Sequence, residues 1–566
     1  MRIAAVTRLC VAVLGCALTA SNSSAQIFTT ILNFDYSNGS GPSYLSLSQG
    51  RDGKLYGTTY GGGLGGGTVF TITPVGALTT LYNFCSESNC TDGVAPYGGI
   101  VQAVDGNFYG ATSEGGTDET DCFWGCGTVF KITPDGTLTT LHSFNSIDGS
   151  EPVGSLIQGL DGNLYGTTFR GGSVRCNNLG GDPGCGTVFR ITPQGDFKTL
   201  YNFGASAGDG IHPSAGLIQG KDGSFYGTTW YGGNGNCDDG FGSGCGTVFK
   251  ITPEGRMTVV YSFCLTIGCI DGQAPQGALV QSNMGEFYGT TSLGGAIGAG
   301  SVFRVNFRGM LTTLHSFGGE NGAYPSGQLV QATDGNFYGT TEIGGTDGDG
   351  TLFVVTQAGK WKLLHGFTQA DGQTPRSGLL QSTLGPLFGT TLEGGPYGSG
   401  TIFSLDMGLG PFVAFVRDSG TVGATGGILG QGFTGTTSVS LNGTPANFTV
   451  VSDTFLKATV PNGATSGFVT VATPSGTLTS NKPFRVMPQL LSFDPPSGPV
   501  GTQVTITGVS LTQTQGVGFG DRVPAQFTVN SDTQVTAIVP AGAKSGKIGI
   551  ETKGGQAVSA GVFTLQ

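Results

Sequence analysis

Short apolar and aromatic segments alternate with glycine-bounded turns along most of the chain. One representative unit has such segments at Gly216–Gln219, Phe225–Thr229, Gly246–Thr252 and Met257–Phe263. Asp222-Gly223 separates the first two segments and is a two-residue hairpin signal, because a type I′ turn requires positive φ at both central residues. Segments of this length that are rich in β-branched and aromatic residues are typical of strands. The pattern predicts four antiparallel strands in each unit.

The element Tyr-Gly-Thr-Thr, or a close variant, marks the second predicted strand and recurs in seven units. Its copies begin at Tyr56, Tyr109, Tyr165, Tyr226, Tyr288, Tyr338 and Phe388. Each copy is followed by Gly-Gly and then by Gly-[Thr/Ser]-[Val/Leu/Ile]-Phe. Four antiparallel strands in units of about 50–60 residues are typical of β-propeller blades, whereas a β-helix has a much shorter repeat. The sequence therefore predicts an all-β chain in which residues 26–407 form a seven-bladed β-propeller.

The seventh unit lacks a fourth strand of its own. The chain leaves the repeat soon after Phe403, but Phe28–Phe34 matches the pattern of the fourth strand Leu138–Phe144. The same [Asp/Asn]-Gly-x-x-Pro motif follows both segments. We therefore expect residues 28–34 to pair antiparallel with residues 400–405. This pairing would close the last blade and remove two open sheet edges.

The pattern changes after Gly410. Short alternating strands at about ten-residue spacing predict two β-sandwiches, over residues 411–487 and 488–566. The second sandwich opens with Pro495–Gly508 and closes with a segment that begins at Val535–Gly546. The first sandwich contains a copy of that closing segment at Ala458–Gly467.

These motifs carry two family resemblances. Residues 488–566 resemble the IPT/TIG family of immunoglobulin-like domains, and residues 411–487 resemble it with a degenerate opening segment. The Tyr-Gly-Thr-Thr repeats resemble GloVer, a tandem-repeat family of secreted bacterial proteins. Neither resemblance implies a catalytic motif. The IPT/TIG resemblance implies a spacer or adhesion module, and the DNA binding of some eukaryotic relatives does not suit this acidic chain.

Residues 1–25 have the pattern of a secretory signal peptide. Arg2 and Arg8 precede or border an apolar stretch that is too short to span a bilayer, and Ser23-Ser24-Ala25 offers a small-residue cleavage site. Lipoprotein processing at Cys16, which would anchor the chain in an outer membrane, is the alternative. No later apolar run reaches the roughly 20 residues that a transmembrane helix needs. We expect a protein that is secreted by a bacterium or displayed at its surface.

Composition excludes several classes of protein. Glycine supplies 105 of the 566 residues, which argues against a helical fold because glycine is unfavourable inside helices. Only 11% of residues are charged, so charge-driven disorder is excluded. The formal net charge of −11 becomes more negative when Arg2 and Arg8 leave with the signal peptide. This balance argues against a nucleic acid or an anionic membrane as partner.

The cysteines that follow the signal segment fall into five close pairs. They are Cys85/Cys90, Cys122/Cys126, Cys176/Cys185, Cys237/Cys245 and Cys264/Cys269. In a secreted chain these pairs predict five local disulfides. Metal binding is the alternative for the closest spacings, but histidine is scarce and the compartment oxidises thiols. No metal or other cofactor is expected.

All five pairs fall in two classes of loop, those that join blades and those between second and third strands, which share one face of a propeller. Long loops braced on a rigid scaffold often carry binding sites, so we predict the ligand on this face. The alternative is a purely structural role, in which the disulfides only stiffen glycine-rich loops.

In each unit an Asp or Asn precedes Gly-x-x-Pro in the loop that enters the next blade. These residues could ring the axis and hold a cation or sugar hydroxyls, or they could simply form turns. They are Asn38, Asp92, Asp148, Asp209, Asp271, Asn321 and Asp371.

Three aromatic residues in the same loops, Trp124, Trp230 and Tyr231, could stack on sugar rings or could anchor the loops. Four irregularly placed acids near this face could serve a glycosidase, which needs two carboxyl groups. They are Glu114, Glu151, Glu342 and Glu393. The sequence thus predicts non-catalytic extracellular binding of a glycan or a protein. A carbohydrate-active hydrolase or lyase and a purely structural surface protein are the alternatives.

Overall fold

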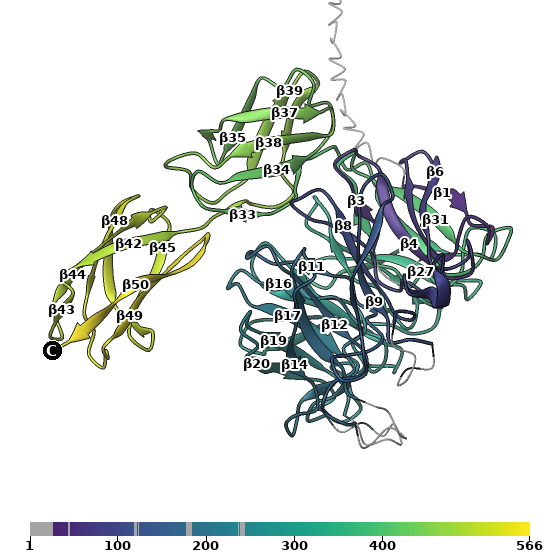
Figure 1. The fold of residues 1–566 in the computed structure, drawn as a ribbon, viewed down its shortest axis with the longest axis horizontal. Coiled ribbons are helices and arrows are strands. Elements are labelled where there is room, and N and C mark those ends of the chain that lie inside the picture. The colour runs from purple at the N-terminus through teal and green to yellow at the C-terminus, as the bar shows by residue number, and fades with distance from the viewer. Residues whose placement is uncertain are drawn as a thin grey trace, which may run out of the picture.

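The computed structural model describes residues 26–42, 46–117, 122, 124–176, 184–235, 237 and 244–566 (Figure 1). Strands dominate the described chain, and its helical elements are the short 3₁₀ turns η1 (Ser88–Cys90) and η2 (Gly319–Asn321). No helix among these residues has the length and apolar character that crossing a membrane demands. The predicted signal peptide, with the alternative at Cys16, lies outside the described residues.

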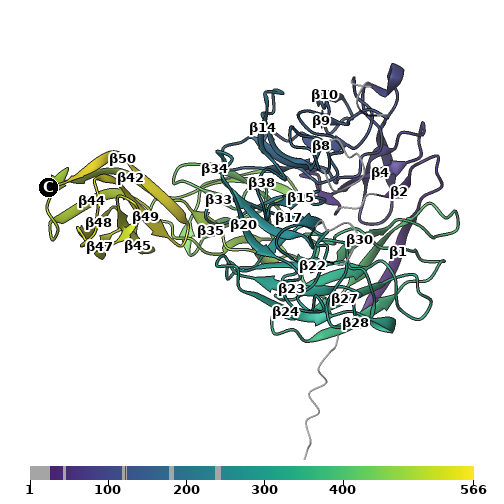
Figure 2. The same cartoon turned by 90° about the horizontal axis from the view of Figure 1, so that it is seen from below.

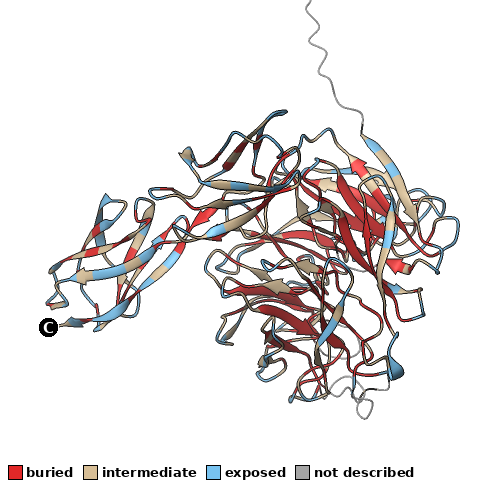
Figure 3. Cartoon of the chain, turned by 45° about the horizontal axis from the view of Figure 1, so that its top comes forward, coloured by how far each residue is buried: buried red, intermediate tan, exposed pale blue. Residues whose placement is uncertain are grey.

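The predicted four-strand unit is present as an antiparallel sheet. In the representative unit, β16 (Ile218–Gln219), β17 (Phe225–Thr229), β19 (Thr247–Ile251) and β20 (Met257–Ser262) pair in that order. The second and third strands are almost wholly buried and the fourth is partly exposed (Figure 3).

Within the described residues, six such sheets follow one another along the chain, and the unit above is the fourth. The first contains β2 (Ser40–Pro42), β3 (Ser48–Gln49), β4 (Leu55–Gly61), β5 (Thr68–Ile72) and β6 (Leu78–Asn83). The second contains β7 (Val101–Gln102), β8 (Phe108–Thr112), β9 (Thr128–Ile132) and β10 (Leu138–Ser143). The third contains β11 (Ile157–Gln158), β12 (Leu164–Thr168), β13 (Thr187–Ile191) and β14 (Phe197–Asn202). The fifth contains β21 (Val280–Gln281), β22 (Phe287–Thr291), β23 (Ser301–Val305) and β24 (Leu311–Ser316), and the sixth contains β25 (Val330–Gln331), β26 (Phe337–Thr341), β27 (Thr351–Val355) and β28 (Trp361–Gly366).

The seventh sheet joins the two ends of the repeat region. It contains β29 (Leu380–Gln381), β30 (Leu387–Thr391) and β31 (Thr401–Asp406), and its outer strand is β1 (Ile27–Asn33). Figure 2 shows β1 and β30 in this sheet, and β31 lies between them. β1 pairs antiparallel with β31, so that residues 28 and 33 lie opposite residues 405 and 401. The expected pairing of residues 28–34 with residues 400–405 is confirmed.

The first two residues of Tyr-Gly-Thr-Thr make close contacts within the sheets. In the fourth sheet the Tyr226 hydroxyl donates to Asp222 Oδ2 in the hairpin turn, at 3.0 Å. Burial, followed by the negative charge of Asp222, raises the pKa of Tyr226, so the phenol stays protonated and able to donate. A Cβ atom on Gly227 would lie 2.6 Å from Cζ of Phe249, so only glycine fits between these strands.

The two threonines bond in different directions. Thr228 Oγ1 donates to the carbonyl of Gly277, in the segment that enters the fifth sheet, at 3.2 Å. Thr229 Oγ1 lies 2.8 Å from Thr247 Oγ1 on the neighbouring strand of its own sheet. Both hydroxyls therefore satisfy polar groups in a buried layer. In the second sheet Ala111 replaces the first threonine and has no hydroxyl for the contact to the next sheet.

A glutamine lies on each short inner strand, and six of these glutamines accept from a backbone N–H of the preceding sheet. Gln219 accepts from the backbone N–H of Leu160 in the third sheet and donates to the carbonyl of Gly223 in its own hairpin. An equivalent bond runs from the seventh sheet to the first, from the N–H of Thr383 to Gln49 Oε1 at 2.9 Å. The contacts between sheets thus include the last and the first.

The tail folds as two sandwiches that share one strand order. One sheet of the first sandwich has the order β32 (Ala414–Phe415), β34 (Thr425–Leu429), β38 (Phe455–Thr459), β37 (Phe448–Ser452). Its other sheet has the order β36 (Thr444–Pro445), β35 (Ser438–Leu441), β39 (Val469–Thr473), β40 (Gly476–Thr479). A parallel pair, β33 (Ser419–Gly420) with β41 (Arg485–Val486), completes it. One sheet of the second sandwich has the order β42 (Gln489–Asp494), β44 (Gln503–Val509), β48 (Gln534–Ile538), β47 (Gln526–Ser531). Its other sheet has the order β43 (Ser497–Gly498), β50 (Gly555–Leu565), β49 (Gly546–Thr552), β45 (Thr514–Phe519), β46 (Val523–Pro524). Each sandwich has its own apolar core.

The first sandwich packs against the hairpin ends of the repeat sheets (Figure 1). Arg417 Nη2 donates to the carbonyl of Gly159 at 2.8 Å, and Thr454 Oγ1 donates to the carbonyl of Arg51 at 2.6 Å. The Arg51 guanidinium lies 4.8 Å from the centre of the Phe455 ring. The second sandwich lies beyond the first, away from the repeat sheets (Figure 2).

The tight glycine contact leads to a stability prediction. A Cβ on Gly339 would lie 2.7 Å from both Leu329 Cδ2 and Phe353 Cζ. Gly339→Ala should therefore destabilise the repeat region by about 1–3 kcal/mol through overpacking. Denaturant unfolding followed by tryptophan fluorescence tests this, because all three tryptophans of the chain lie in the repeat region.

Gly366→Ala is the matched control in the same sheet. A Cβ there would have its nearest neighbour at 3.8 Å, and its φ is not in the left-handed region. Equal unfolding midpoints for the two variants would contradict the packing account.

Candidate functional site

The two classes of loop that were expected to share a face lie side by side. In the fourth sheet β15 (Gly210–Ile211), from the loop that enters the sheet, pairs with β18 (Tyr231–Gly232), from the loop after the second strand. Single bridges join the same two loops in other sheets, such as Ser150 to Arg170 and Val94 to Glu114. We use the name loop face for the residues between second and third strands together with those that connect successive sheets. This face lies at the strand ends opposite the hairpins that contact the first sandwich.

The loop face carries disulfides in all five predicted pairs. The bridged Cα atoms lie 4.1 to 5.5 Å apart. Two of these bridges meet in the fourth sheet, where the Sγ atoms of Cys237, Cys245, Cys264 and Cys269 lie within 4.8 Å of one another. Both pairs are oxidised, so their sulfur atoms lack the thiolate charge of a metal ligand.

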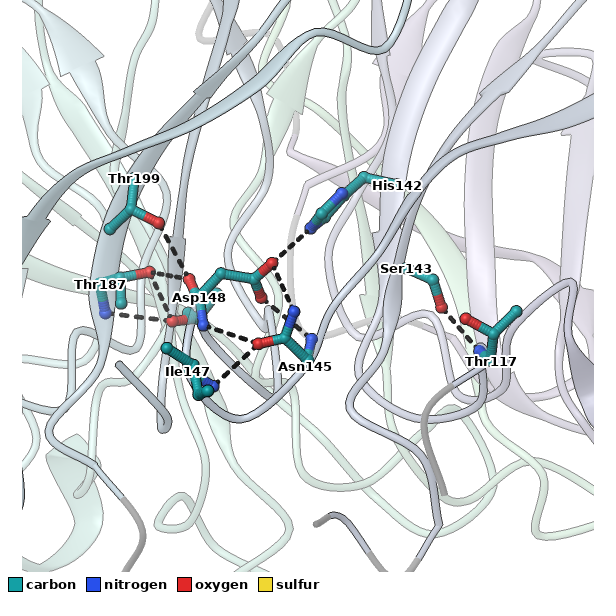
Figure 4. A network of polar contacts seen from close by, with 9 residues as sticks. Thr117, His142, Ser143, Asn145, Ile147, Asp148, Thr187 and Thr199 are labelled. Carbon is teal, nitrogen blue, oxygen red and sulfur yellow. Dashed lines mark hydrogen bonds and ion pairs between the residues drawn. The ribbon is translucent and has the colours of Figure 1, made fainter. Parts of the chain in front are cut away.

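The Asp and Asn residues before Gly-x-x-Pro bond to their own sheets. Asp92 is fully buried and accepts from the Tyr82 hydroxyl at 2.9 Å and from both the N–H and the hydroxyl of Ser86. Asp148 bonds to His142 Nε2 at 3.1 Å and to the N–H and side-chain amide of Asn145 (Figure 4).

The other members follow the same rule. Asp209 and Asp271 accept from Tyr201 and Tyr261, and Asp371 bonds to His365. The two asparagines accept backbone N–H groups of their own loops: Asn38 from Asp35, and Asn321 from Gly318. These partners sit on or just after the fourth strand, so each side chain lies toward the outer strand of its sheet. Local bonding accounts for the residue type at this position without a ligand.

Aromatic side chains gather where the second strands reach the loop face. The Trp230 and Tyr231 rings lie 5.3 Å apart and nearly parallel. Phe169 from the third sheet stacks on His212 at 4.7 Å and lies 5.8 Å from Trp230. We call Phe169, His212, Trp230 and Tyr231 the aromatic cluster. Trp124, the remaining predicted aromatic, lies inside the Cys122–Cys126 loop and is 71% exposed.

His212 belongs to a set of equivalent positions that the sequence interpretation missed. The residue before the proline has φ between 53° and 59° in every unit, although most of these residues are not glycine. They are Gly41, Ala95, Glu151, His212, Ala274, Tyr324 and Thr374. In the fourth sheet the N–H of His212 bonds to Cys185 and its carbonyl accepts from Trp230, and the other units repeat this pattern. The backbone at this position is thus the same in every unit while the side chain varies. A variable residue before a proline that all seven units share was the sequence signal that could have identified these positions.

Charged groups flank the aromatic cluster. Arg170 Nη1 lies 2.9 Å from Glu151 Oε1, and its guanidinium lies 5.7 Å from the Phe169 ring. Burial, with a smaller contribution from the charge of Glu151, raises the pKa of Glu114. Of the other two predicted acids, Glu342 is paired with Arg376 at 2.9 Å and Glu393 is exposed. The loop face therefore combines flat apolar rings with a few fixed charges.

Two family models match the chain. The model described as the Gloeobacter/Verrucomicrobia repeat matches residues 89–270 and 235–451, and the IPT/TIG domain model matches residues 488–565. No curated protein matches the sequence.

Several solved structures are similar to this chain. The surface glycan-binding protein PbSGBP-B from Prevotella bryantii has 19% identity over 26% of this chain and 38% of its own length, with a TM-score of 0.21. A fungal alcohol oxidase in complex with copper has 13% identity over 96% of this chain and 100% of its own, with a TM-score of 0.41. The PQQ-bound aldose sugar dehydrogenase from Streptomyces coelicolor has 13% identity over 68% and 98%, with a TM-score of 0.35.

The buried carboxylate contacts predict a structural role for Asp92. Asp92→Ala leaves the Tyr82 hydroxyl and the Ser86 N–H without their acceptor, which should cost about 1–3 kcal/mol of stability. Denaturant unfolding of this variant should show the loss, while the exposed loop variant Asp347→Ala should stay within about 0.5 kcal/mol of the parent. Unchanged stability of Asp92→Ala would contradict this role and favour direct ligand contact.

Proposed function

This chain belongs to the Gloeobacter/Verrucomicrobia repeat family and ends in an IPT/TIG domain, and from that premise we propose that it binds a glycan on its loop face without catalysis. It acts as a secreted or cell-surface protein. The repeat region presents the site, and the two sandwiches act as spacers toward the surface.

The aromatic cluster is the observation that carries this proposal. Sites for small molecules combine apolar and aromatic walls with a few polar groups that fix orientation. Trp230 and Phe169 offer flat rings, and the Arg170–Glu151 pair beside them offers donors and acceptors for sugar hydroxyls. Large aromatic side chains also bury much area for few rotatable bonds, which lowers the entropy cost of binding.

We propose that the seven sheets form a closed seven-bladed propeller over residues 26–407, followed by domains at 411–487 and 488–566. The pairing of β1 with β31 and the bond from Thr383 to Gln49 support a closed ring. A closed ring would hold the loop face rigid, so that ligand binding would not lose free energy to ordering of the scaffold.

An extracellular location accords with the chemistry of the loops. Local disulfides persist in oxidising compartments and are rare in the cytosol. Five of them lie on the loop face. Cleavage after residue 25 would release the mature chain, and lipidation at Cys16 would instead anchor it.

A carbohydrate-active hydrolase is the second candidate, favoured by one specific observation. Glu114 is half-buried beside Glu151, and its raised pKa is the property of a general acid. Against it, the Glu151 carboxylate is already engaged in an ion pair with Arg170.

Replacing Trp230, the tryptophan of the aromatic cluster, by alanine tests the binding proposal. On a glycan array, the chain comprising residues 26–566 should bind a defined set of sugars, and Trp230→Ala should weaken that binding about tenfold, or about 1.4 kcal/mol. Phe307→Ala is the matched control, because Phe307 is 70% exposed in the turn between β23 and β24 on the hairpin side. Equal losses in both variants, or no binding to any glycan, would refute the proposal.

Incubation with the bound glycans separates binding from hydrolysis. We expect chromatography to show no new reducing ends, because Glu151, the acid beside Glu114, is held by Arg170. If the parent chain instead releases product, Glu114→Gln but not Trp230→Ala should abolish that release. This outcome would establish that the protein is a hydrolase.

A further inference from the structure

A cavity lies away from the loop face, between the repeat sheets and the first sandwich. Its volume is about 290 Å³. One wall consists of inner-strand and hairpin residues of the second and third sheets, including Val101, Ile157 and Leu160. The other wall comes from the first sandwich. The cavity is large enough for a sugar-sized molecule, since a single water occupies roughly 30 Å³ of liquid.

The sandwich wall concentrates positive charge. Arg417, Lys482 and Arg485 all line the cavity, and Asp418 is the acidic residue among the lining side chains. Lys221 lies next to this group, because its carbonyl accepts from Arg485 Nη1 at 3.4 Å. The ammonium of Lys221 itself donates to the carbonyl of Asn283, so three cations line the cavity beside one carboxylate, in a chain whose formal net charge is −11.

The cations of this cleft outnumber the carboxylates around them. Asp418 is bonded to Arg485 at 3.1 Å, and the charges of Asp161 and Asp418 both favour the charged form of Arg417, so three lining cations meet two carboxylates. Arg417 donates to the carbonyl of Gly159, but a guanidinium has five N–H groups. Burial, and then the charge of Arg485, lower the pKa of Lys221, as expected for crowded cations. A bound anion would relieve this repulsion.

We propose that the cavity between the repeat sheets and the first sandwich binds a small organic carboxylate, of which a uronic acid is the sugar example. The guanidinium of Arg417 and the ammonium of Lys482 hold the carboxylate, since the planar arginine fork matches its two oxygens. The apolar side chains of Val101, Ile157 and Leu160 pack against the body of the ligand. The site needs both domains, so the first sandwich is part of a binding site and more than a spacer.

Calorimetric titration of the chain comprising residues 26–566 tests this site, with D-glucuronate as probe and D-glucose as its neutral counterpart. Glucuronate should bind and glucose should not. Lys482→Gln should weaken glucuronate binding severalfold and the double variant with Arg417→Gln about tenfold. Raising NaCl from about 50 to about 500 mM should also weaken it, because salt screens the partly exposed charges.

Lys544→Gln is the matched control, since Lys544 is an exposed lysine paired with Asp521 on the second sandwich. Lys482 takes no part in the interdomain hydrogen bonds described above, so its variant should keep the domains together. Trp230→Ala should leave glucuronate binding unchanged, which separates this site from the loop face. Equal binding of glucose, no effect of Lys482→Gln, or tighter binding of inorganic sulfate or phosphate than of glucuronate would overturn the proposal.

Discussion

The close approach of three strands at one glycine is the constraint on which the repeat region depends. At Gly227 a single added methyl group would collide with Phe249 and with Leu217 on the neighbouring strands. The same collision occurs at the equivalent glycine of the other sheets, as at Gly110 and Gly389. Because the aromatic ring of the third strand fills the space where a side chain would be, the sheet packs densely with few residues.

This packing explains why the surrounding residues repeat so closely. Once the glycine fixes the strand separation, the preceding tyrosine reaches the hairpin aspartate in five sheets. In the fourth sheet the two threonines reach a neighbouring sheet and a neighbouring strand. Each of these groups is buried and needs its partner, so substitution is costly. Variation is therefore displaced to the loop face, where the residue before the proline keeps its backbone bonds whatever its side chain. A scaffold of this kind can change the side chains of its loop face without changing its fold.

Much of this architecture could be predicted because its signals are local. Asp-Gly turns, β-branched segments and paired cysteines lie within a few residues of one another, and the pairing of residues 28–34 followed from one missing strand pattern. The role of the Asp and Asn positions could not be predicted, because the same pattern suits a turn, a ligand and a buried acceptor. Only the placement of Tyr82 and His142 on the adjacent strand distinguishes these possibilities.

The aromatic cluster and the charged cavity escaped sequence interpretation for another physical reason. Phe169 and Trp230 occupy equivalent positions in successive repeats, so their proximity depends on how neighbouring sheets pack rather than on their distance in sequence. The cavity combines Ile157 with Arg417 and Lys482, which come from separate domains. Its charges oppose the acidic average of the chain, and a net charge says nothing about such local clustering. The bond from Arg417 to the carbonyl of Gly159 shows how the packing of the first sandwich against the repeat sheets, and not the sequence alone, decides where a cation lies.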